Sequence, residues 1–342
     1  MQEQISRTCP SSGAKPAHMG ASSRMSSLDV MKCFAAYCVV WIHYGSGWLS
    51  PIVRCAVPIF FVITGYYYPV MIEKGNFWRH IRKLVVMVLC ASAMYGVVEL
   101  QHQIRHDTLQ EWMQKTLRLR HILGLIVYDN DMFGFHLWYF WAVLYDLTIF
   151  YLADKWKLTR FLRILAPLLL LLFFVGNFTP WYGKCRNFLF MGLPCMMTGR
   201  LIRENSDGKF SFLSNGKYLW AYVGGALMLV CCEMLSLHFI YSDRGIRDMY
   251  IFTLPLFLPL FYYALKHPHF GEGTFWATIG SKYSAYIYIF HVLAARFLGH
   301  IVARDASLLT KSMYPFVVFG ISLCMSWAFV KILKKARPHR VQ

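Results

Sequence analysis

The chain has 342 residues, of which 57% are hydrophobic and 17% aromatic, while only 15% are charged. A soluble domain usually carries about 25% charged residues, so this chain has too little polar surface for a large water-facing body. A formal net charge of +18 is compatible with nucleic-acid binding, but the Lys and Arg residues stand between apolar runs rather than on one basic face. That distribution is typical of anchored membrane spans and argues against a nucleic-acid partner.

The apolar runs are long enough to cross about 30 Å of hydrocarbon at about 1.5 Å per helical residue. Strands of a membrane barrel are segments of about ten residues in which apolar and polar residues alternate, and these runs do not show that pattern. The sequence therefore predicts an all-α fold, a polytopic membrane helical bundle with about ten transmembrane helices. The spans are predicted near residues 28–47, 56–72, 84–101, 136–153, 161–177, 187–202, 218–236, 250–265, 275–297 and 314–333.

Segments predicted on the same side of the membrane as the N-terminus contain more Lys and Arg residues than segments predicted on the opposite side. The positive-inside rule then predicts cytoplasmic N- and C-termini and a multi-pass protein of the plasma (cytoplasmic) membrane. We expect a disordered N-terminal tail over residues 1–25, a transmembrane domain over 26–333 and a basic C-terminal tail over 334–342.

The first span, SSLDVMKCFAAYCVVWIHYG, contains three ionisable residues, Asp29, Lys32 and His43. Such residues are costly inside a membrane, so each is a functional candidate. Lys32 and His43 are 11 positions apart, which leaves them about 20° apart around the helix and about 16 Å apart along it. Asp29 can pair with Lys32 one turn away. Lys32 alone can also be read as snorkelling to the interface, but a deep histidine needs partners that lipid cannot supply.

Basic residues and one long connection follow. Arg79, Arg82 and Lys83 precede the third span, either as membrane anchors or as guanidinium and ammonium groups for phosphate. The connection over residues 102–135 contains EWMQKTLRLRHILGLIVY, which predicts an amphipathic helix on the bundle surface. A re-entrant segment that lines an outer cavity is the alternative.

Polar side chains recur in the later spans. His136, Trp138, Tyr288 and His291 lie at the outer end or in the middle of their predicted spans, and Arg186 lies at an outer end, against the charge rule. His136 and His291 can orient a substrate or relay a proton, or they can be hydrogen-bonded interior histidines.

Most of the ten cysteines lie in apolar runs, where they behave as small hydrophobes. No CxxC pair with metal-ligand spacing occurs in the sequence, so we expect no metal site. Cys55 and Cys185 fall near predicted outer ends and can be proposed to pair.

The first span resembles that of the integral-membrane acyltransferase 3 family, whose signature is Arg or Lys, ten residues, then His. Five more stretches are similar to family motifs, in the same order, and the likeness covers about residues 24–335. They are VPIFFVITGYYY (57–68), FWRHIRKL (77–84), HLWYFWAVL (136–144), RNFLFMGLPCMMTGRLI (186–202) and SKYSAYIYIFHVL (281–293).

This resemblance implies an acyltransferase that transfers groups other than amino-acyl groups. Family members usually move acetyl from acetyl-CoA to hydroxyls of cell-envelope sugars and related molecules. We therefore expect a membrane O-acyltransferase, by this likeness an O-acetyltransferase, with acyl-CoA as donor and an envelope glycan or glycolipid as acceptor. Many members carry an extracytoplasmic domain after the bundle. Here only a short polar segment follows the last span, so we expect the bundle to perform the whole transfer.

Roles follow from the same resemblance. His43 is expected to act as the general base or to carry an acyl-imidazole, which the sequence does not distinguish. Lys32 is expected to contact acyl-CoA or to line the path of the acyl group, with Asp29 as its partner. Arg79, Arg82 and Lys83 are expected to hold CoA phosphates. His136, His291 and Tyr288 are expected to orient the acceptor, relay a proton or hydrogen-bond the acyl carbonyl. Trp138 is expected to pack against a sugar or pantetheine, and Arg186 to bind an acidic or sugar acceptor.

Two other classes of function remain open at this point. A transporter or flippase for a glycan, lipid or amino acid would use the buried charges to line a passage and would form no bond. A structural partner in an envelope-polymer export complex would tolerate the loss of both Lys32 and His43.

Overall fold

The computed structural model describes residues 24–45, 49–116, 118–179, 182–205, 216–241, 246–299 and 308–336, and within them every regular element is helical. The predicted all-α fold is therefore confirmed for the described residues. The helices are α1 (Ser26–Tyr44), α2 (Ser50–Val53), α3 (Ala56–Glu73), α4 (Phe77–Arg105), α5 (Leu109–Thr116), α6 (Leu119–Tyr128), α7 (Trp138–Lys155), α8 (Thr159–Asn177), α9 (Leu193–Glu204), α10 (Gly216–Tyr241), α11 (Thr253–Lys266), α12 (Phe275–Lys282), α13 (Ser284–Gly299) and α14 (Leu308–Ala336). Short 3₁₀ turns cover Phe135–Leu137 and Tyr182–Lys184, and a π turn covers Phe188–Gly192.

Each predicted span coincides with a helix or with consecutive helical pieces. Within the described residues, five helical stretches are long and apolar enough to cross a membrane by themselves; they are Ser50–Glu73, Phe77–Arg105, Thr159–Asn177, Gly216–Tyr241 and Ser312–Ala336. The other predicted spans form shorter or less apolar helices. The chain is thus a multi-pass helical membrane protein, while the count of ten spans and the side of each terminus remain predictions.

Three segments differ in detail from the predicted helices. The ninth predicted span is broken at Tyr283 into α12 and α13, and the sixth begins with the π turn before α9. The connection over 102–135 forms two helices, α5 and α6, where one was expected, because the chain is extended at Arg118. Helix α14 continues to Ala336, and residues 1–23 and 337–342 of the predicted tails lie outside the described residues.

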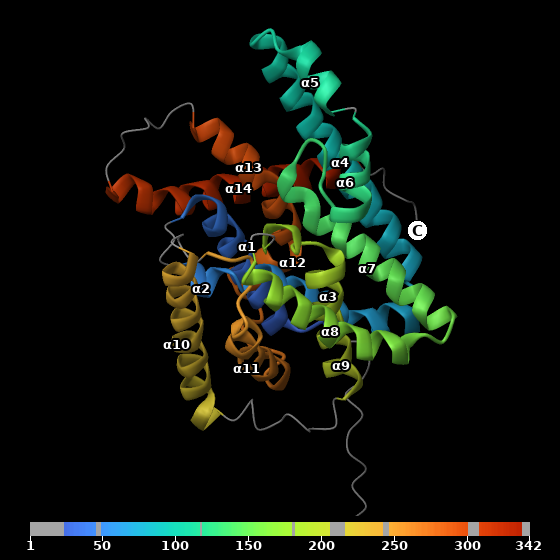
Figure 1. Ribbon diagram of the computed structural model, residues 1–342, viewed down its shortest axis with the longest axis vertical. Helices are drawn as coiled ribbons and strands as arrows, with labels where there is room; N and C mark the ends of the chain where they lie inside the picture. Colours follow the sequence, from blue (N-terminus) through green and yellow to red (C-terminus); the bar gives the residue numbers. More distant parts are fainter. Residues whose placement is uncertain are drawn as a thin grey trace, which may run out of the picture.

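Helix α1 is the centre of the packing. It contacts α3, α11, α12, α13 and α14, and Figure 1 shows it near the middle of the molecule with α10 on one side and α4 and α7 on the other. Gly280 lets α12 approach α1 closely, because a Cβ there would lie 1.6 Å from the carbonyl oxygen of Asp29. Small residues at such crossings allow membrane helices to approach backbone to backbone.

A second close crossing joins α3 and α9. A Cβ at Gly65 would lie 1.9 Å from the backbone oxygen of Met196, and a Cβ at Gly199 would lie 2.0 Å from that of Val62. Each helix therefore contributes one glycine to the crossing. The contact fixes α9, and the π turn that leads into it, against α3.

An ion network joins one end of α7, α8 and α9. The buried guanidinium group of Arg200 contacts Asp154 at 2.9 Å and Glu204 at 2.8 Å, and Arg163 contacts Glu204 at 2.7 Å. Tyr68 of α3 donates to Asp154 at 2.8 Å. Mutual pairing offsets the desolvation of these charges. Cys55 and Cys185 are both free thiols, so the structure does not contain the suggested pair.

The α3–α9 crossing predicts unequal tolerance of alanine at two glycines. Gly199→Ala is expected to lower the free energy of unfolding by about 1–3 kcal/mol, because the added methyl group meets backbone that cannot rotate away. Gly224→Ala in α10 is the matched control, since no atom lies within 4 Å of its new Cβ. Thermal unfolding of the purified protein in detergent measures both, and equal melting temperatures for the two variants would contradict the crossing.

Candidate functional site

Three histidines from distant parts of the chain meet at one point. His43 lies in the last turn of α1, His136 in the 3₁₀ turn before α7 and His291 in the middle of α13. The ring of His291 is 5.1 Å, centroid to centroid, from that of His43 and 5.1 Å from that of His136. His136 and His291 are 1% and 0% exposed, and His43 is half-buried. His43 is thus the member of the cluster that a substrate can reach.

The tautomer of His291 follows from the hydrogen bond that its ring makes to its own helix. Its Nδ1 lies 2.7 Å from the backbone carbonyl oxygen of Tyr288. A carbonyl oxygen only accepts hydrogen bonds, so Nδ1 carries the proton and Nε2 of the neutral ring has a free lone pair. That Nε2 and both ring nitrogens of His136 are buried without a hydrogen-bond partner among the described residues. The cluster therefore contains proton acceptors that the fold itself does not use.

A tyrosine hydroxyl of α4 is hydrogen-bonded to the helix that carries His291. The Tyr95 hydroxyl of α4 donates to the carbonyl oxygen of Ile289 at 2.6 Å and accepts from the amide of Leu293 at 3.2 Å. Both backbone groups belong to α13, so the hydroxyl joins α4 to the turn of α13 that carries His291. The Tyr95 ring also lies 4.6 Å from the ring of His136, so one residue positions two of the three histidines.

The carboxylate of Asp131 holds the turn that presents His136. It accepts hydrogen bonds from the backbone amides of Phe133 and Gly134 at 2.9 Å each and from the Trp141 indole at 2.9 Å. It also accepts one from Ser92 of α4. The Tyr288 hydroxyl donates to the backbone oxygen of His136 at 2.7 Å. The turn is therefore tied to α4, α7 and α13 at once, which fixes the position of His136.

A small cavity of about 30 Å³ opens beside His43. Its lining combines apolar side chains with a few polar groups, and comprises Val39, Ile42, His43, Arg54, Val57, Trp138, Arg186, Met191, Asp248 and Tyr288. Four residues singled out by the sequence, His43, Trp138, Arg186 and Tyr288, thus share one cavity. Its volume is enough for about two water-sized groups, so a larger substrate must widen it to bind.

The remaining sequence candidates gather away from this cavity. Lys32 pairs with buried Asp29 at 3.2 Å and lies 5.7 Å from the ring centroid of Tyr67. His80 in the first turn of α4 lies within electrostatic range of both Lys32 and Lys83. Lys32 therefore shares a region with the basic start of α4. The side chains of Arg79, Arg82 and Lys83 there are exposed.

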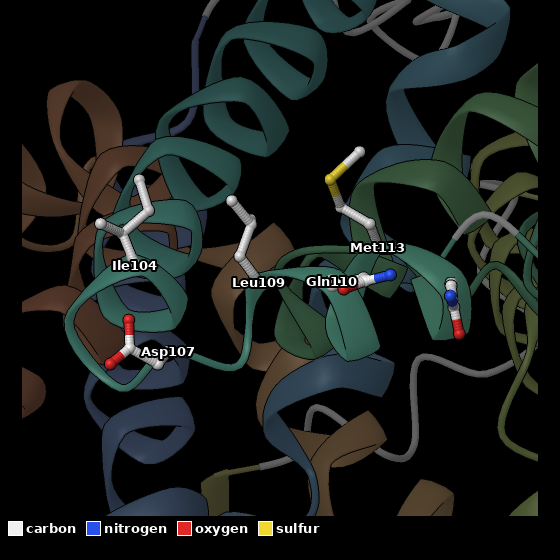
Figure 2. Close-up of a pocket in the computed structure, with 6 residues that line it drawn as sticks. Ile104, Asp107, Leu109, Gln110 and Met113 are labelled. Atoms are coloured by element: carbon white, nitrogen blue, oxygen red, sulfur yellow. The ribbon is translucent and has the colours of Figure 1, made fainter.

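A larger depression, of about 630 Å³, lies between the end of α4 and α5 (Figure 2). Figure 2 shows Ile104, Leu109 and Met113 turned to the same side of the chain. Asp107, Gln110 and Gln114 are the polar side chains among its described lining residues. No histidine or arginine stands among these described lining residues, whereas both types converge at the His43 cavity, which is the stronger site candidate.

The structure also identifies residues that the sequence analysis missed. Asp146 of α7 is fully buried with both carboxylate oxygens unpaired among the described residues, and a Cβ at Gly192 would lie 2.2 Å from its Oδ2. An acid inside the apolar run FWAVLYDLTIF is a signal that sequence alone offers. Tyr95, Arg54 and Asp248 carried no such signal, since tyrosine is common in spans and the other two lie between predicted spans.

Comparison with known proteins adds one match. The acyltransferase 3 family model, described as an acyltransferase domain, matches residues 25–331. Neither the curated proteins nor the solved structures contain a significant match to the chain.

Because the Tyr95 hydroxyl joins α4 to α13, we expect Tyr95→Phe to be less stable than the wild-type protein. The variant removes both hydrogen bonds of the hydroxyl, and with them the bridge between α4 and α13, which is expected to cost about 1–3 kcal/mol of unfolding free energy. Tyr286→Phe removes a hydroxyl from a ring on α13 that packs on Phe329, and is expected to change stability by less than about 0.5 kcal/mol. Thermal unfolding compares them, and a Tyr95→Phe protein as stable as the control would contradict the bridge.

Asp129, in the connection after α6, predicts a pH-dependent stability. Its Oδ2 accepts from the amide of Phe188 at 2.7 Å, and burial raises the pKa of its carboxyl from 3.8 to about 8. The folded protein then keeps a proton that the unfolded chain has lost, so this group lowers the unfolding free energy as pH rises from about 4 to about 8. Asp129→Asn keeps an acceptor oxygen and removes the titration. Its melting temperature relative to wild type should be higher at pH 8 than at pH 5, and a constant difference would contradict this effect.

Proposed function

The chain belongs to the acyltransferase 3 family and is a membrane acyltransferase, and from this premise we propose that it transfers an acyl group, acetyl in the first instance, from acyl-CoA to a hydroxyl of a cell-envelope glycan or glycolipid. The observation that carries the proposal is the cluster of His43, His136 and His291 beside a cavity lined by Trp138 and Tyr288. It combines free proton acceptors with an aromatic wall, which suits a sugar hydroxyl.

The proposed step begins with deprotonation of the acceptor. His43, the accessible member of the cluster, takes the proton of the hydroxyl as its oxygen attacks the thioester carbonyl carbon of acyl-CoA. The new C–O bond forms, the C–S bond breaks, and CoA leaves as a thiolate that takes up the proton. A neutral imidazole suits this role near pH 7.

His291 and His136 support His43 in this proposal. The Nε2 lone pair of His291 belongs to a ring 5.1 Å from that of His43, so it can accept the proton or stabilise the imidazolium that forms. His136 extends the same chain of rings. Transfer through an acyl-imidazole on His43 uses the same groups, with C–N bond formation and cleavage added.

The donor is proposed to bind at the Lys32 region. Acyl-CoA carries several phosphate charges, and Lys32 shares its region with the basic start of α4. The exposed Arg79, Arg82 and Lys83 can hold those phosphates, with arginine forks giving bidentate contacts. Asp29 holds Lys32 in place at 3.2 Å. With both termini cytoplasmic, this end faces the cytosolic CoA pool and the His43 cavity faces the outer leaflet of the plasma membrane.

Replacement of the base tests the proposal. His43→Ala is expected to lower acyl transfer at least about 100-fold, the usual contribution of general acid–base catalysis, while insertion and expression stay normal. His106→Ala, at an exposed histidine after α4, is the matched control and is expected to keep full activity. The measurement is transfer of label from radiolabelled acetyl-CoA by the purified protein in lipid, with hydrolysis of acetyl-CoA as a second readout.

The same assay separates acyl transfer from transport. Retained transfer in His43→Ala would overturn the role of this residue. Movement of a glycan or lipid across the bilayer without any dependence on acyl-CoA would favour a transporter and contradict the proposed reaction.

A further inference from the structure

Two arginines and one aspartate stand at the cavity that contains His43. The Arg54 guanidinium, at the end of α2, contacts Asp248 Oδ1 at 3.0 Å, and Arg186 contacts the same oxygen at 3.7 Å. All three side chains line the cavity together with His43, and both arginines lie within electrostatic range of the His43 ring. The three residues are drawn from parts of the chain more than 60 positions apart, so the fold rather than local sequence assembles them.

The charges of this cluster do not cancel. Asp248 supplies one negative charge against two guanidinium groups that never lose their protons. Asp129 lies within electrostatic range of Arg186, but burial raises the pKa of its carboxyl to about 8, so at neutral pH it is mostly protonated. One positive charge is therefore left over at the cavity.

The arginines also keep free hydrogen-bonding capacity. Each guanidinium has five N–H donors in a planar fork that matches a carboxylate or a phosphate. The Nε of Arg54 is buried without a partner among the described residues. The Arg186 guanidinium carbon also lies 5.3 Å from the ring centroid of Trp138, and this contact keeps the guanidinium group at the cavity. Asp248 demonstrates that a carboxylate fits between the two groups.

From these contacts we infer that Arg54 and Arg186 bind an anionic group of the acceptor, a carboxylate or a phosphate, and so make the enzyme selective for acidic acceptors. The inference rests on the proposed function, because it assigns this anion to the molecule that His43 deprotonates. An anion held by the two arginines anchors the acceptor in the same cavity as His43. Such anchoring of a reacting group raises the rate by reducing the entropy lost in the reaction.

Binding of small probes tests the inference without requiring turnover. The probes are methyl glucuronide, which carries a carboxylate, glucose 6-phosphate, which carries a phosphate, and methyl glucoside, which is neutral. At matched ionic strength, a probe that binds the folded protein raises its melting temperature. We expect stabilisation by at least one anionic probe and none by methyl glucoside, and the stronger anion identifies the group that the site prefers.

Variants then locate the binding. Arg54→Gln and Arg186→Gln are expected to weaken anion binding about tenfold each, because each loses a charge-assisted hydrogen bond. Arg186→Lys keeps the charge and should retain part of the affinity. Arg163→Gln, which breaks an exposed pair with Glu204, is the matched control and should bind as wild type does. A variant is compared only when its thermal unfolding without probe is cooperative, which shows that it is folded. The preference of the wild-type protein among the probes is measured without any variant.

Equal stabilisation by neutral and anionic probes would overturn the inference, as would the absence of stabilisation by any of them. Anion binding that is unchanged in both arginine variants would overturn it too. Label transfer from acetyl-CoA is measured in parallel. If the wild-type protein transfers no label but still binds anionic probes selectively, the proposed reaction is contradicted and the anion site is supported. The two failures are therefore distinguishable.

Discussion

Buried imidazole nitrogens that find no hydrogen-bond partner in the described part of the chain are the feature around which the rest of the structure is arranged. Neither lipid nor an apolar helix interior supplies hydrogen bonds, so such groups destabilise the fold unless the surrounding contacts hold them in place. Here His291 is held by one bond to its own helix, and His136 is held through its backbone by Tyr288 and Asp131. What these contacts leave free is the proton-accepting capacity that acyl transfer needs.

The helix crossings supply the rigidity that this arrangement requires. Glycines at the α1–α12 and α3–α9 contacts bring backbones together, and the second crossing sets the π turn whose Met191 lines the His43 cavity. Tyr95 adds a hydrogen-bonded bridge between α4 and α13. Because these elements are packed so closely, the cavity is small, and the binding of a sugar-sized acceptor must be coupled to a local opening.

Hydropathy and spacing predicted the helical architecture, because span length and apolar content are local properties of the chain. The same reasoning marked His43, His136 and His291 individually, as ionisable residues in apolar runs. It did not predict the break at Tyr283, the Tyr95 bridge or the tautomer of His291, since each depends on a contact between distant helices. Arg54 and Asp248 lie in connections without periodicity, where a sequence carries no information on which side chains converge.

In the proposed reaction the acyl carbonyl and the acceptor hydroxyl meet beside His43. The most direct test is the structure of the protein with a non-hydrolysable ketone analogue of acetyl-CoA bound in lipid. We expect the analogue's carbonyl carbon to lie within about 6 Å of the nearest His43 ring nitrogen, close enough for a hydroxyl hydrogen-bonded to that nitrogen to attack. A carbonyl carbon held elsewhere, with the His43 cavity still closed, would contradict it.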